Sequence, residues 1–194
     1  MYKLNQRLIL ASGSPRRKEM LSDAGFLFDI IVSDVPEEVI PNETPEQMVK
    51  RLALLKGQAV AETNRESWIL SADTTVVIDN QILNKPVDFD DSVKMLSMLQ
   101  GRAHHVWGGI AFINNSKNYC ETISVCSVVH MRALSLNQIH KYIASGECSD
   151  KAGSYAIQGV GASLIEKVEG SYTNVVGLDL CSVVKKFEQL KLVD

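Results

Sequence analysis

The sequence has few cysteines, and they are not spaced for a metal or redox site. Its 194 residues include four, at positions 120, 126, 148 and 181. These positions form no Cys-x-x-Cys pair and no Cys/His ligand spacing, which excludes a recognisable zinc ribbon or redox motif. We expect buried free thiols, because an unpaired cysteine behaves as a small apolar residue.

An excess of charge of one sign is also missing. The 20 basic and 23 acidic residues leave a net charge of -3, in a chain that is 45% hydrophobic and 22% charged. This balance is typical of a globular protein and argues against a wide basic face for nucleic acid or an anionic membrane. We therefore expect any bound polyanion to be small.

Long apolar runs are absent. No segment approaches the roughly 18 apolar residues of a membrane span, and residues 12–14 interrupt the N-terminal apolar stretch before it reaches the length of a secretory signal. These features predict a cytoplasmic protein without a membrane partner. The phosphate-loop pattern is also missing, and the Gly159-x-Gly161 pair lacks the third glycine of a dinucleotide fingerprint, because position 164 is leucine.

The periodicity alternates between strand-like and helix-like segments, which predicts an α/β fold. Expected strands cover residues 8–11, 28–32, 68–72, 75–78, 103–113, 119–131 and 162–168. Expected helices cover residues 15–24, 90–99 and 135–145, with another from about 174. A further helix begins after Thr44, with the apolar stripe Met48, Leu52, Leu55 and Ala59. We expect a single domain, residues 1–194, with two lobes.

The segment Ser12 to Arg17 has the pattern of an anion site. A strand leads through a Ser/Gly turn into a helix that opens with Arg16 and Arg17. The first N–H groups of a helix carry about half a positive charge, which favours a phosphate above the turn. The same charge disfavours arginines there by a few tenths of a kcal/mol, and a bound anion removes that conflict. The alternative is that both arginines lie in solvent.

Asp73 and Glu37 are candidate carboxylates for catalysis or metal binding. Asp73 is expected to follow the end of a strand at Ala72, with the hydroxyls of Thr74 and Thr75 beside it. A carboxylate there can hold a divalent cation or accept a proton from water, the alternative being a solvated or hairpin aspartate. Glu37 adds a second carboxylate in a loop. Paired acids among basic groups are what metal-assisted attack on a phosphoanhydride requires.

Two lysines stand near these acids in the predicted arrangement. Lys56 lies at the edge of the apolar stripe of its helix, and Lys85 precedes a proline that stiffens its loop. About 4 Å from a phosphate oxygen, each would gain roughly 4 kcal/mol of gross Coulomb energy at an effective dielectric near 20. The alternative for each is an ordinary surface lysine.

Five segments together resemble the Maf family of nucleoside triphosphate pyrophosphatases, in the order of that family and across nearly the whole chain. They are LILASGSPRR (8–17), SADT (71–74), NKP (84–86), KAGSYAIQG (151–159) and GSYTNVVGL (170–178). The resemblance implies an inosine-triphosphatase-like fold, with a mixed, elongated sheet, flanking helices and a central cleft between two lobes. It also implies hydrolysis of a nucleoside triphosphate to the monophosphate and pyrophosphate, with a divalent cation, Mg or Mn.

Site residues follow from the same resemblance. It makes Asp73 the proton acceptor and implies metal binding by Glu37 and Asp73. It implies substrate binding by Ser12, Arg16, Arg17, Lys56, Thr74, Lys85 and Gln158. The subgroup that hydrolyses dTTP and UTP is indicated by Arg16, Thr74 and Gln158. An amide both donates and accepts, as the edge of uracil or thymine requires, whereas the 7-methyl-GTP subgroup tends to have an acid in place of Gln158.

Two residues depart from the family pattern, and the sequence allows more than one substrate, oligomeric state and function. Asn84 replaces a glycine found in many members, which could alter how its loop presents Lys85, and Asp179 replaces a proline inside the expected last helix. Modified pyrimidine nucleotides fit the same base edge. A homodimer is possible. The alternative function is a nucleotide-responsive regulator of septum formation without turnover, although a pure anion binder gains nothing from acids that repel its ligand.

Overall fold

The computed structural model describes residues 2–38 and 40–193, and the chain divides into two compact units. The first unit contains the described residues of 1–73, 108–125 and 177–194, and the second contains residues 74–107 and 126–176. Each unit is therefore assembled from segments that lie far apart in the sequence.

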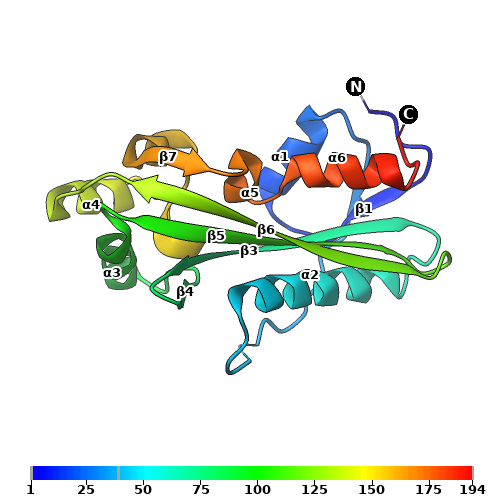
Figure 1. Ribbon diagram of the computed structural model, residues 1–194, viewed down its shortest axis with the longest axis horizontal. Coiled ribbons are helices and arrows are strands. Elements are labelled where there is room, and N and C mark those ends of the chain that lie inside the picture. Colours follow the sequence, from blue (N-terminus) through cyan, green and yellow to red (C-terminus); the bar gives the residue numbers. More distant parts are fainter. Residues whose placement is uncertain (1, 39, 194) are drawn as a thin grey trace. The chain divides into compact units, whose positions relative to one another are not determined.

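Seven strands form a mixed sheet within the described residues, in the order β2-β1-β3-β5-β6-β7, with β4 paired to β3 (Figure 1). The strands are β1 Leu8–Leu10, β2 Asp29–Ile30, β3 Trp68–Ile78, β4 Gln81–Leu83, β5 Ala103–Asn114, β6 Tyr119–Met131 and β7 Ile165–Glu169. β1 runs parallel to β2 and β3, whereas β4 is antiparallel to β3 and β7 is antiparallel to β6. The predicted α/β class with a mixed sheet and flanking helices is confirmed.

The helices begin and end close to their predicted positions in most cases. They are α1 Pro15–Asp23, α2 Pro45–Ala61, α3 Phe89–Leu99, α4 Leu136–Ile143, α5 Tyr172–Val176 and α6 Leu180–Gln189, with 3-10 helices η1 Ala152–Ser154 and η2 Gly159–Leu164. Thr44 and Ser135 each form a capping box at the start of α2 and α4. Ser14 precedes α1 as predicted, but its side chain makes no capping hydrogen bond. Among the helices of the described residues, none has the length and apolar character that crossing a bilayer requires.

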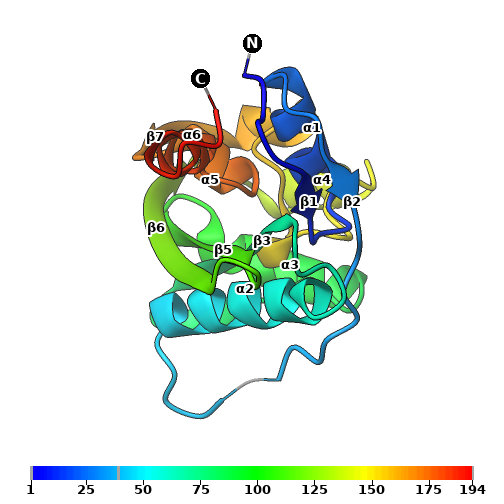
Figure 2. The ribbon, with the colours of Figure 1, turned by 90° about the vertical axis from the view of Figure 1, so that its right-hand side faces the viewer.

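The strands of the first unit bury side chains on both faces. Ile9, Ile69 and Ala111 pack against α2, whereas Leu10 and Leu70 pack against α1 and α6. Figure 2 shows α2 on one side of these strands and α1 and α6 on the other. The alternation of side chains along a strand produces this division, because neighbouring residues point to opposite faces. The second unit has its own core, in which α3 and α4 contribute Leu96, Leu99, Ile139 and Tyr142.

Several predicted boundaries and burials are wrong. The polar residues of 71–75 do not break β3, which is one continuous strand. Residues 162–164 belong to η2, so β7 starts only at Ile165. The expected last helix is two helices, because Gly177 between them has a φ of 139° that helical backbone does not allow. Leu55 is exposed, since α2 buries Val49, Ala53 and Val60 together with the predicted Met48 and Leu52.

The cysteine prediction is correct only in part. All four cysteines are free, and Cys148 is buried and Cys126 half-buried. Cys120, on β6, and Cys181, on α6, are exposed and belong to none of the apolar cores of the described residues.

Candidate functional site

The candidate site in the first unit begins where β1 ends. Leu10 pairs with Leu70, and the Ala11 N–H donates to the Leu70 carbonyl at 2.8 Å. The chain then turns through residues 12–14 into α1, while β3 continues to Asp73 and beyond. Asp73 therefore lies on a part of β3 that β1 no longer covers. It is the neighbouring strand that ends near Asp73, and not β3 itself as the sequence predicted.

Arg17 joins three separate segments of the first unit at this point. Its Nη1 donates to Ser12 Oγ at 3.0 Å and to the Ala72 carbonyl at 2.8 Å, and its Nε donates to the Gly177 carbonyl at 2.8 Å. Ser12 Oγ also accepts the Ser14 N–H at 3.3 Å. The guanidinium thus fixes the turn before α1 against β3, one residue from Asp73.

Charges of both signs surround the Arg17 guanidinium. Burial lowers the pKa of Arg17, the nearby Asp73 and Glu37 act to raise it, and Arg16 adds to the lowering. Arg16 itself is half-buried. The predicted cations and carboxylates of residues 12–73 are therefore close enough to interact electrostatically.

Lys56 binds both predicted carboxylates. Its Nζ lies 2.7 Å from Asp73 Oδ1 and 2.7 Å from Glu37 Oε1. The side chains of Lys56 and Asp73 are 15% and 10% exposed, whereas that of Glu37 is 56% exposed. Two carboxylates thus converge on one ammonium group, with Asp73 on the buried side and Glu37 on the side open to solvent.

A close approach of α2 to β3 makes the Lys56 contact possible. A Cβ on Gly57 would lie 2.5 Å from Ser71 Oγ and 2.7 Å from Ile113 Cδ1, so a larger residue does not fit there. Ser71 Oγ donates to the Ala53 carbonyl at 2.6 Å. Since Ser71 and Asp73 are two residues apart on one strand, both face α2.

Arg51 holds the loop that carries Glu37. Its Nε and Nη2 each lie 2.6 Å from an oxygen of Glu43, and Nη2 also donates to the Glu38 carbonyl at 3.0 Å. The Glu43 hydrogen bonds raise the pKa of Arg51, and the Arg51 hydrogen bonds lower that of Glu43. The role of Arg51 was not predictable from the sequence, because its bidentate partner Glu43 lies in a loop without periodicity.

Three predicted residues lie in the second unit. Gln158 and Lys85 are exposed and Thr74 is half-buried. Thr74 directly follows Asp73 in β3, so its side chain points to the opposite face of the strand. The prediction that the Thr74 hydroxyl lies beside the Asp73 carboxylate is therefore wrong.

The two departures from the family pattern have structural explanations. The Asn84 carbonyl accepts the Gly153 N–H at 3.1 Å, and Asn84 is not among the described residues with positive φ. The position therefore does not require glycine. Asp179 lies before α6 and not within a helix as expected, and its Oδ2 caps α6 by accepting the Ser182 N–H at 3.2 Å.

Comparison with known families now gives a decisive match. The family described as "Maf-like protein" matches residues 7–190. The chain belongs to this family. Proteins named dTTP/UTP pyrophosphatase from Syntrophotalea carbinolica and Geobacter metallireducens are 47% and 45% identical to it. These alignments cover 96% and 93% of this chain, and 86% and 94% of the two relatives.

The fold of this Maf-like chain resembles that of a solved structure, the Ham1 protein of Staphylococcus aureus. The TM-score is 0.55, over 96% of this chain and 100% of that chain. The two sequences are 13% identical, so the likeness concerns the fold alone.

The carboxylates of the Maf-like site fit a divalent cation as a partial ligand set. No group of three or more His, Cys, Asp or Glu residues suited to a metal occurs within 2–38 and 40–193. Glu37 and Asp73 nevertheless direct one oxygen each to a single cationic group. Mg²⁺ is usually bound by one or two carboxylates, with water and substrate phosphates as its other ligands, and this pair suits that pattern.

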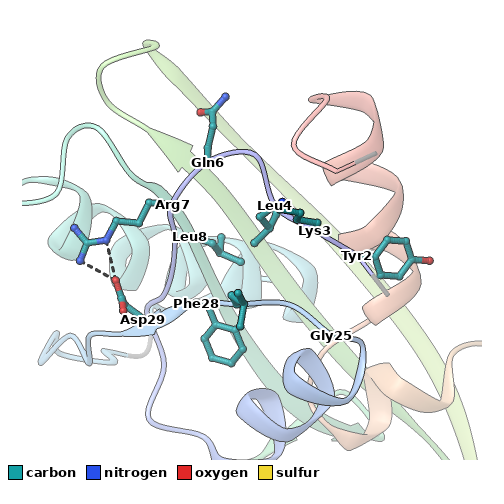
Figure 3. Close-up of a pocket in the computed structure, with 10 residues that line it drawn as sticks. Tyr2, Lys3, Leu4, Gln6, Arg7, Leu8, Gly25, Phe28 and Asp29 are labelled. Carbon is teal, nitrogen blue, oxygen red and sulfur yellow. Dashed lines mark hydrogen bonds and ion pairs between the residues drawn. The ribbon is translucent and has the colours of Figure 1, made fainter.

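A pocket elsewhere in the first unit is separate from these residues. Its volume is about 690 Å³, and residues from the segments 2–8 and 25–29 line it. Figure 3 shows Leu4, Leu8 and Phe28 around it, with the ion pair of Arg7 and Asp29 at one side. None of the predicted site residues is among those that line this pocket.

Proposed function

We propose that this Maf-like chain hydrolyses dTTP and UTP to the nucleoside monophosphate and pyrophosphate. Relatives that align with almost the whole chain carry the name dTTP/UTP pyrophosphatase. The observation that carries the proposal is the position of Lys56, 2.7 Å from both Glu37 and Asp73. A buried carboxylate among cations can act on water next to a polyphosphate.

In the proposed reaction, the Asp73 carboxylate accepts a proton from the attacking water. The water oxygen forms a bond to the α-phosphorus, and the bond from that phosphorus to the bridging oxygen breaks. The electron pair of that bond leaves with pyrophosphate. Lys56, Arg16 and Lys85 bind triphosphate oxygens and neutralise the charge that the transition state develops. Ser12 and Arg17 bind the same group and hold the turn before α1.

Base selection falls to Gln158, Thr74 and Arg16 in this proposal. The Gln158 amide pairs with the donor and acceptor groups of the pyrimidine edge. We further propose Glu37 and Asp73 as ligands of a Mg or Mn ion, which when bound would neutralise phosphate oxygens. A cytoplasmic location, a homodimer and the lack of nucleic-acid or membrane partners stay predictions.

The first test replaces Asp73 with asparagine. Pyrophosphate release is measured with dTTP, UTP, dGTP and 7-methyl-GTP, in the presence of Mg or Mn. We expect the wild type to prefer dTTP and UTP, and Asp73→Asn to lower kcat by about 10²–10⁴-fold, because the amide cannot accept the proton. Nucleotide binding should change far less.

Asp79→Asn is the matched control, since it removes an exposed carboxylate from the turn that follows the same strand. It should retain wild-type turnover. Wild-type turnover in Asp73→Asn would show that Asp73 is not the base. Release from 7-methyl-GTP alone would refute the pyrimidine assignment, and no release from any nucleotide would leave the non-catalytic regulator as the better description.

A further inference from the structure

The loop that carries Gln158 is bound to a carboxylate outside the predicted site. Glu147 follows α4, and its Oε1 accepts the Val160 N–H at 2.8 Å while its Oε2 accepts the Gly161 N–H at 3.0 Å. Each oxygen therefore holds one of two consecutive backbone N–H groups. All of these residues belong to the second unit.

The backbone of Gly159 lies directly against the Glu147 carboxylate. Its φ is 63°, in the region that favours glycine, and a Cβ there would lie 2.3 Å from Glu147 Oε1. Gln158 itself has extended backbone and immediately precedes this contact. The backbone directly after Gln158 thus fits against Glu147, and no other residue type would allow so close an approach.

The other side of Gln158 is fixed by Tyr142. Its buried hydroxyl accepts the Ala156 N–H at 2.9 Å. Gly161 completes the arrangement, because a Cβ there would lie 2.8 Å from the Tyr142 hydroxyl and 2.1 Å from the Ala156 carbonyl. The backbone is therefore held both before and after Gln158, while the Gln158 side chain is exposed to solvent.

The bonds between Glu147 and the loop depend on its charge. The hydrogen bonds from Val160 and Gly161 lower the pKa of Glu147, because they stabilise its ionised form. Hydrogen bonds from N–H groups to an ionised carboxylate are also stronger than neutral ones. A neutral amide in its place could accept one N–H but would turn its own N–H₂ group toward the other.

We propose that Glu147 is a positioning residue for base selection. It fixes the loop 158–161 before the nucleotide binds, so that the Gln158 amide already lies where it can meet the pyrimidine edge. This inference rests on the proposed function. An amide on a mobile backbone would lose conformational entropy on binding, and that loss weakens discrimination between bases. The chemistry at phosphorus uses Asp73 and Lys56 of the first unit, so kcat should depend little on Glu147.

The test measures kcat/KM for dTTP and dGTP with Glu147→Gln. We expect the ratio of the two values to fall about tenfold, as the loss of one charge-assisted hydrogen bond implies, while kcat for dTTP stays within about twofold of the wild type. Glu166→Gln is the control, because Glu166 is an exposed glutamate on β7 of the same unit, and it should keep the wild-type ratio.

Two further variants separate positioning from folding. Glu147→Ala exposes the two N–H groups, so added formate should raise the lowered ratio, whereas formate should have no such effect on Glu147→Gln. Gly159→Ala disturbs the same contact from the loop side and should lower the same ratio. Circular dichroism verifies that each variant is folded.

The outcomes distinguish this inference from the proposed function. A wild type without preference for dTTP over dGTP contradicts the pyrimidine assignment itself. A wild type with that preference, which both Glu147→Gln and Gly159→Ala retain, overturns the positioning role and leaves the proposed function intact. A fall in kcat without a change in the ratio would also overturn the positioning role.

Discussion

The Arg17 side chain is bound by the protein itself. The Arg17 guanidinium donates to Ser12 Oγ and to the carbonyls of Ala72 and Gly177. Main-chain carbonyls are constant partners that do not depend on a substrate. Arg17 was predicted to bind substrate, and this geometry indicates that it also stabilises the site itself.

Replacement of Arg17 by lysine tests that structural contribution. Lysine keeps the charge but lacks the planar fork of donors that reaches three acceptors at once. We expect the free energy of unfolding, measured in urea, to fall by about 2 kcal/mol, because buried acceptors lose their partners. Lys18→Arg, at an exposed position of the same helix, is the control and should leave the free energy of unfolding unchanged. Equal stability of the two variants would contradict the role given to Arg17.

At the scale of elements, the helix α2 and the strand β3 are the pair that brings Lys56 to Asp73. The helix reaches the strand closely because Gly57 faces Ser71 and Ile113. Lys56 directly precedes Gly57 in the chain, so the position of its ammonium group depends on how near the helix lies to the strand. The packing of one glycine therefore affects both the stability of the first unit and the geometry of the site.

Gly57→Ala should separate α2 from β3. Alanine favours helix by about 1 kcal/mol over glycine, but the added methyl overlaps Ser71 Oγ, which is fixed by its bond to the Ala53 carbonyl. We expect a net loss of about 1–2 kcal/mol in unfolding free energy and a lower kcat. Gln58→Ala, at an exposed position of the same helix, should change neither.

A double variant checks the cause. Ser71→Ala removes the nearer of the two atoms that the new methyl overlaps, so Gly57→Ala combined with Ser71→Ala should lose less stability than the sum of the single variants. Simple addition of the two losses would mean that the overlap with Ser71 is not what destabilises Gly57→Ala.

Elements with strong local signals were predictable from the sequence. The capping boxes of α2 and α4 are visible as Thr44 and Ser135 with a glutamine three residues later. The continuity of β3 through Asp73 was not, because it depends on packing against α2 and on the strands beside it. The buried face of α2 is also turned slightly from the predicted one. Packing against the strands, and not the periodicity of the helix, determines that Val49 and Ala53 are buried and Leu55 is exposed.

Of the candidate site residues, Ser12 and Asp73 lie within the quoted family motifs and Glu37 and Lys56 lie outside them, whereas other residues that hold them were not predicted. The structure brings Ser12, Glu37, Lys56 and Asp73 together in the first unit, and their roles in a reaction stay predictions. The residues that hold them, such as Arg51, have no motif of their own. Their contacts cross loops without regular periodicity, and a sequence pattern does not specify such contacts.

At the scale of the whole molecule, each of the two units has its own core and its own polar residues within that core. In the second unit, His104 is fully buried, and its Nε2 lies 2.7 Å from the Tyr155 hydroxyl. Burial lowers the pKa of His104 to about 4, and His105 and His130 add to the lowering. Burial also raises the pKa of Tyr155, so its hydroxyl stays protonated and can donate to a neutral His104.

This buried histidine makes the stability of the molecule depend on pH. The unfolded chain binds a proton at His104 below about pH 6.5, whereas the folded chain does so only below about pH 4. The contribution of His104 to stability is therefore complete above pH 6.5 and falls as the pH decreases, by about 2 kcal/mol at pH 5.

We expect urea unfolding at pH 7.5 and pH 5 to show this loss in the wild type and a smaller loss in His104→Gln. The carboxylates contribute equally to both proteins, so the difference between the two losses isolates His104. The exposed His105 adds only a secondary part of this lowering, so His105→Gln should reduce the loss by less than His104→Gln does. Equal losses in the wild type and His104→Gln would mean that His104 is protonated in the folded protein.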